Sequence, residues 1–118
     1  MQRILSLLLF SLFFQPFLFS QSNDVILFTE EKEKFHVVLN GILQNPTPVT
    51  NVKIMQLPAP SYRCRIIFTN TELGYFDFTL NFPYVDEEIT MAIKKDKKGE
   101  YISKLFDSKP ISPNNEKT

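Results

Sequence analysis

The chain has 118 residues and a formal net charge of zero, with 13 Lys and Arg residues against 13 Asp and Glu residues. This balance excludes the strongly basic surface on which nucleic-acid binding depends, and the length allows one domain. One cysteine and one histidine fall short of the three or four protein ligands of a zinc site. We therefore expect no metal, no cofactor and no nucleic-acid partner.

Residues 1–20 predict a secretory signal peptide. Arg3 precedes an apolar run over residues 4–19, and the chain becomes polar directly after Ser20. We expect cleavage after Ser20, export, and a mature protein that begins at Gln21. The alternative is an uncleaved membrane anchor, for which the run is a little short of the roughly 20 apolar residues of a spanning helix. In that case the protein contacts the membrane through this segment alone.

Residues 21–107 predict a small antiparallel β-sandwich of the immunoglobulin-like kind. Short runs of alternating or continuous apolar residues are separated by turn residues, and aromatic and β-branched residues are plentiful. We expect about seven strands, over residues 25–28, 35–39, 49–57, 62–69, 75–82, 89–95 and 101–106. Asn40-Gly41 predicts a tight turn after the second of these runs. The polar end of the chain, residues 108–118, predicts a flexible tail.

Cys64 is expected to be a buried structural residue. It alternates with Arg63 and Arg65, so its side chain shares the inward face with Ile66 and Phe68. A redox or nucleophilic role needs a lowered pKa of the thiol, and the two arginines point away from the sulfur. An intermolecular disulfide is the remaining alternative, since a lone cysteine cannot form an internal one.

Residues 37–68 carry a local motif. A strand ends in Asn40-Gly41, Thr47-Pro48 follows, and a later strand with an aromatic-x-apolar alternation begins at Tyr62. This order resembles a PEGA-type domain, although Pro58–Ser61 stands where that family has a Pro-Gly turn. The resemblance implies a small β-sandwich module of bacterial surface and envelope proteins, which binds a partner or acts as a spacer.

The whole layout is similar to a group of short exported proteins of the Bacteroidota whose function is not characterised. The shared features are the strand Val25–Phe28, the run Arg65–Phe68 and the Lys-rich hairpin Ile93–Gly99. This resemblance implies export to the bacterial envelope, either to the periplasm or to the outside, and it implies no activity.

Two surface features are candidate binding sites. Tyr75 and Tyr84 flank a Phe-rich strand and are candidates for an aromatic platform that would bind a sugar ring. The predicted hairpin tip carries four lysines that suit an acidic envelope protein or an anionic glycan: Lys94, Lys95, Lys97 and Lys98. Both features also have a structural interpretation, because exposed single aromatics are common and charged tips protect edge strands from pairing.

No catalytic constellation is evident. His36 has no recognisable nucleophile or orienting carboxylate, and Asp86-Glu87-Glu88 predicts a solvated loop rather than a calcium site or a hydrolytic pair. We therefore expect a non-enzymatic, exported envelope protein that serves as an interaction or accessory module. A carbohydrate- or peptidoglycan-binding module is the alternative, and a small periplasmic enzyme is a third hypothesis.

Overall fold

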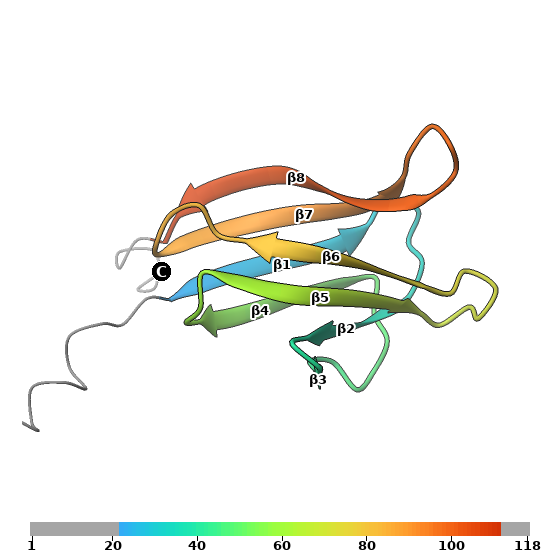
Figure 1. The fold of residues 1–118 in the computed structure, drawn as a ribbon, viewed down its shortest axis with the longest axis horizontal. Helices are drawn as coiled ribbons and strands as arrows, with labels where there is room; N and C mark the ends of the chain where they lie inside the picture. The colour runs from blue at the N-terminus through green and yellow to red at the C-terminus, as the bar shows by residue number, and fades with distance from the viewer. Residues whose placement is uncertain (1–21, 112–118) are drawn as a thin grey trace, which may run out of the picture.

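The computed structural model describes residues 22–111, which form eight strands in two packed sheets (Figure 1). The strands are β1 (Asn23–Thr29), β2 (Phe35–Leu39), β3 (Ile42–Leu43), β4 (Asn51–Leu57), β5 (Ser61–Phe68), β6 (Tyr75–Asn81), β7 (Glu87–Lys95) and β8 (Tyr101–Pro110). One sheet has the order β4-β1-β7-β8 and the other has the order β3-β2-β5-β6. The predicted all-β sandwich is confirmed. The predicted signal, residues 1–20, lies outside the described residues, as do positions 112–118 of the predicted tail.

The core lies between the two sheets and consists of the inward residues of their strands. In β5 the prediction is confirmed, because Cys64, Ile66 and Phe68 are buried whereas Arg63 and Arg65 are exposed. The buried cluster contains Val25, Leu27, Phe35, Val37, Leu39, Ile54, Leu57, Cys64, Ile66, Phe68, Leu80, Phe82, Ile89 and Ile93. Each large apolar side chain of this kind contributes about 1.5–3 kcal/mol on burial, so this cluster is the main source of stability.

One pair of neighbouring strands departs from the predicted antiparallel arrangement. Within residues 22–111 every strand pair is antiparallel except β1 and β7, which run parallel. Parallel neighbours need a long crossover, and the chain from β2 to β6 supplies it. Hydrophobic alternation identifies the faces of a strand but carries no information about its direction, so the sequence pattern could not predict this pair.

The Asn40-Gly41 turn is confirmed, and it adds a strand to the predicted number. Both residues have positive φ, 48° and 84°, and the turn joins β2 to the two-residue strand β3. The next predicted strand begins at Asn51 rather than at Val49, because Val49 forms only an isolated bridge to Phe35.

The prediction of a loop at Asp86-Glu87-Glu88 is wrong for the two glutamates, which begin β7. The Glu87 N–H donates to Oδ1 of Asn23 at 2.9 Å. The carboxylate of Glu88 lies 3.6 Å from Nζ of Lys53 and 4.0 Å from Nζ of Lys109. These partners compensate the charge of Glu88 and make it compatible with a strand.

The predicted tail also begins too early, because β8 continues to Pro110. Glu87 at the start of β7 lies opposite Pro110, so the longer β7 provides β8 with a partner to that point. The last residues of β8 are polar and exposed, which an edge strand tolerates, and proline is also acceptable at an edge.

Candidate functional site

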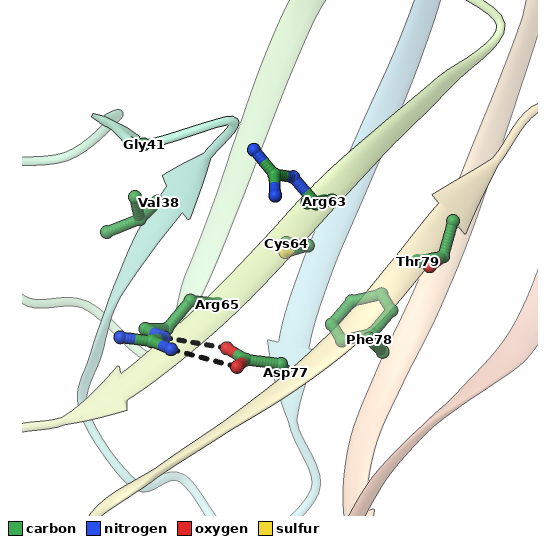
Figure 2. Close-up of a pocket in the computed structure, with 8 residues that line it drawn as sticks. All are labelled: Val38, Gly41, Arg63, Cys64, Arg65, Asp77, Phe78 and Thr79. Atoms are coloured by element: carbon green, nitrogen blue, oxygen red, sulfur yellow. Dashed lines mark hydrogen bonds and ion pairs between the residues drawn. The ribbon is translucent and has the colours of Figure 1, made fainter.

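The outer face of the β3-β2-β5-β6 sheet contains a cavity of about 480 Å³, which we call the arginine hollow (Figure 2). Its lining residues come from the β2–β3 hairpin, β5 and β6, and they are Val38, Gly41, Arg63, Cys64, Arg65, Asp77, Phe78 and Thr79. Two guanidinium groups and one carboxylate line the hollow, which leaves it with an excess of one positive charge.

The register of three neighbouring strands creates the arginine hollow. Val38 of β2 lies opposite Arg65 of β5, which lies opposite Asp77 of β6. Two residues earlier in β5, on the same face of the sheet, Arg63 lies opposite Thr79 of β6. Because the two arginines are long and their neighbours Val38 and Thr79 are short, space stays open above the short side chains.

Arg65 is held rigidly in this hollow. Its Nε and Nη2 donate to the two carboxylate oxygens of Asp77 at 2.7 and 2.9 Å, as the dashed lines in Figure 2 show. These hydrogen bonds lower the pKa of the Asp77 carboxyl and raise the pKa of Arg65. The guanidinium carbon of Arg65 also lies 4.1 Å from the ring centroid of Tyr75, within cation–π range. A planar, bidentate and stacked guanidinium is a preorganised donor.

Arg63 presents a second guanidinium to the arginine hollow. Its side chain is exposed, and it forms no ion pair with any residue in the range 22–111. Its backbone N–H donates to Oδ1 of Asn40 at 2.8 Å, which fixes the strand beside the β2–β3 turn. Figure 2 shows its guanidinium apart from the Arg65–Asp77 pair. This geometry leaves Arg63 available to an anionic group.

A second cavity, of about 460 Å³, brings together two of the predicted site residues, Tyr75 and Lys95. We call it the aromatic cleft; it is lined by Glu72, Leu73, Tyr75, Phe76, Lys95, Gly99, Glu100 and Tyr101. The Lys95 ammonium lies 5.4 Å from the ring centroid of Tyr101. Burial, together with a 2.6 Å hydrogen bond to Glu33, raises the pKa of Tyr101 to about 12.

The other predicted site residues lie apart from these cavities. Tyr84 is exposed beyond the end of β6, whereas Tyr75 begins that strand, so roughly 20 Å of strand separates them and they cannot hold one sugar ring together. Lys94 lies 3.8 Å from the carboxylate of Glu30. Lys97 and Lys98 are exposed on the β7–β8 turn.

Cys64 is buried, as predicted. Desolvation, with a smaller contribution from the charge of Asp77, raises the pKa of Cys64 from 9.0 to about 12. A thiolate is therefore rare at neutral pH. His36 is half-buried on the outer side of β2, where its Nδ1 lies 2.8 Å from the carbonyl oxygen of Asn45.

Comparison of the chain with known proteins identifies no relative. No protein-family model, no curated protein and no solved structure matches the chain. Within residues 22–111 no group of three His, Cys, Asp or Glu side chains could hold a metal ion. The same part of the chain contains no helix that is long and apolar enough to span a membrane.

Sequence reasoning missed the pair of Arg65 and Asp77. Strand alternation placed Arg65 on the outward face of one strand and Asp77 on the outward face of the next, which is a usable signal. The register between the two strands depends on the path of the loop at residues 69–74. This loop is held by an Asn70 turn and ends at Gly74 with positive φ, and it is longer than the two-residue hairpin turn whose type would fix the register. The sequence therefore identified the outward face but not the contact.

Proposed function

We propose that this chain is an exported, non-enzymatic interaction module of the bacterial envelope, and that the arginine hollow receives an acidic group of a partner protein. The observation that carries the proposal is the exposed Arg63, which has no ion-pair partner among residues 22–111 and lies beside the preorganised Arg65. Guanidinium groups bind carboxylates through charge-assisted, often bidentate hydrogen bonds, which are stronger than neutral ones. A cavity with a few converging polar groups is the usual form of a recognition site.

The test compares envelope proteins captured by the wild-type chain and by an Arg63→Gln variant. Glutamine keeps most of the side-chain length but removes the charge, so we expect the captured protein to dissociate about tenfold more readily. Lys97→Gln is the matched control, since it removes one positive charge from an exposed turn outside the hollow. Equal capture by wild type and Arg63→Gln would contradict the proposal.

A glycan-binding module is the second candidate, and the aromatic cleft favours it. Three aromatic side chains line this cleft together with Lys95 and two glutamates, so stacking surface and hydrogen-bonding groups adjoin one another. One face of Tyr75 is already covered by Arg65, which leaves its other face for a ligand. We expect retention on peptidoglycan that is lost in Tyr75→Ala.

The control for the glycan candidate is Tyr84→Ala, which removes another exposed tyrosine that lies outside both cavities. Loss of retention in both tyrosine variants would indicate nonspecific adsorption. A captured protein that is lost in Arg63→Gln but kept in Tyr75→Ala supports the protein-binding proposal over the glycan candidate.

A further inference from the structure

β8 is the longest edge strand in the described part of the chain, and no other strand of residues 22–111 pairs with its outer edge. It has 10 residues, against seven each for the edge strands β4 and β6 and two for β3. In Figure 1 β8 runs along the upper boundary of the molecule. An unpaired edge offers a row of backbone donors and acceptors to a further strand.

Two opposite charges lie on the same side of β8. Lys104 lies opposite Ala92 and Asp107 lies opposite Thr90, and these two residues of β7 are two positions apart. Residues two apart share a face of the sheet, so Lys104 and Asp107 also share a face although they are three apart. A β-bulge in β8 supplies the extra residue between them.

Neither charge has an ion-pair partner in the described part of the chain. Lys104 and Asp107 are both exposed. Between them stand two large apolar side chains, Leu105 at 54% and Phe106 at 70% exposure. The ring of Phe106 lies edge-on to Phe28, with centroids 5.3 Å apart, on the outer side of the sheet. A strand that carries a positive and a negative charge on the same face is complementary in charge to its own antiparallel copy.

We propose that β8 pairs antiparallel with β8 of a second copy, about a twofold axis between Leu105 and Phe106. In this register Lys104 of each chain lies opposite Asp107 of the other on the outer face of the sheet. Leu105, which lies opposite Met91, and Phe106, which packs on Phe28, point to opposite faces and do not pair with each other. The bulge permits this register, because it gives Lys104 and Asp107 the same orientation on the strand. The β4-β1-β7-β8 sheets of the two copies then form one continuous sheet. The same surface of β8 is used by both copies, as a twofold interface requires.

The proposal is independent of the arginine hollow, which lies on the other sheet, and its test uses charge reversal. Wild type, Lys104→Asp and Asp107→Lys are expressed from the full-length sequence and examined by sedimentation equilibrium. The wild type is expected to dimerise. Each single variant places like charges opposite one another twice, so we expect its dimer dissociation constant to rise about tenfold.

Mixing the two variants is the decisive step. A Lys104→Asp chain has acidic side chains at both positions, and an Asp107→Lys chain has basic side chains at both. Opposite charges therefore meet twice in the mixed pair, and we expect a heterodimer at least as tight as the wild-type dimer. The control mixes Lys97→Asp, which changes the exposed β7–β8 turn, with Asp107→Lys. General attraction between oppositely charged chains would give an equally tight heterodimer in this mixture too, whereas the proposed register predicts none that is as tight.

A monomeric wild type at all concentrations would overturn the proposal. Dimers that persist equally in both single variants would also overturn it, since they would use another surface. Intact mass is recorded for each preparation, so that all samples compared have the same N-terminus. Thermal unfolding confirms that each variant is folded, and the neutral variants Lys104→Gln and Asp107→Asn provide a second weakening series if a reversal prevents folding.

Discussion

Asn45 takes the place of a missing strand neighbour along part of β2. Its Oδ1 accepts a hydrogen bond from the N–H of Val37 at 2.7 Å, and its Nδ2 donates to the carbonyl of Phe35 at 2.9 Å. The short strand β3 pairs only with Val38 and Leu39, so Asn45 satisfies backbone groups that β3 does not reach. A buried amide can do this because it carries both a donor and an acceptor.

Replacing Asn45 by alanine should destabilise the fold strongly. The change leaves the buried N–H of Val37 without a partner and removes one of the two hydrogen bonds to the Phe35 carbonyl, which keeps the N–H of Val49 at 3.2 Å. The expected loss in free energy of unfolding is therefore about 1–3 kcal/mol. Urea unfolding measures it. Asn51→Ala is the matched control, because Asn51 is exposed at the start of β4 and should change stability by less than about 0.5 kcal/mol. Similar losses in both variants would show that Asn45 is not a structural bridge.

Cys64 predicts a loss of stability at alkaline pH. Its pKa is 9.0 ordinarily and about 12 in the folded chain, so the folded state holds the proton more tightly than the unfolded state. The contribution is fully present below pH 9 and declines as the pH rises toward 12, by up to about 1.4 kcal/mol per pH unit. The raised pKa of Tyr101 acts in the same direction.

Urea unfolding at increasing pH measures this decline, and Cys64→Ala separates the thiol from the other groups. The variant should have lower stability at neutral pH because of the lost packing, but a shallower decrease above pH 9. Identical pH slopes in the two proteins would mean that the thiol is not held in its protonated form by burial.

Leu80 and Thr79 test the register at the level of a single element, β6. Leu80 is 1% exposed and faces the core, whereas its neighbour Thr79 faces outward into the arginine hollow. Leu80→Ala should lower the free energy of unfolding by about 2–5 kcal/mol, since it removes buried atoms and leaves a cavity. Thr79→Ala should be close to neutral. If the threonine variant were the less stable of the two, the assigned faces of β6 would be reversed.

The elements also show what the sequence pattern contains and what it omits. The bounds of β2 and the two faces of β5 were predictable, because a period of two residues is sufficient to place a half-buried strand. The parallel neighbours β1 and β7 were not, and neither was the contact between Arg65 and Asp77. Both depend on which strands become neighbours and in which register. That information is distributed over the whole chain and is not contained in the pattern of a single strand.

At the scale of the whole molecule, the order of the strands predicts an order of local stability. β1 and β7 are the inner strands of one sheet, and β2 and β5 are the inner strands of the other. Amides of an inner strand are released only when neighbours on both sides separate, whereas edge segments open locally. Hydrogen exchange followed by NMR should be slowest in β1 and β7 and fastest in β3, which has two exposed residues. Equal protection of β3 and β1 would contradict this order.

Hydrogen exchange in β8 also tests the proposed pairing with a second copy. As an edge strand it should exchange faster than β7 in the monomer, most of all beyond Leu105, where every residue of the strand is exposed. Antiparallel pairing with a second copy would satisfy its outer backbone groups, so protection in β8 should rise with protein concentration. Lys104→Asp alone should lose this dependence, and an equimolar mixture with Asp107→Lys should recover it. Protection in β8 that rises with concentration in Lys104→Asp alone would place the second copy elsewhere along the strand, because the pairing would then not depend on the two charges.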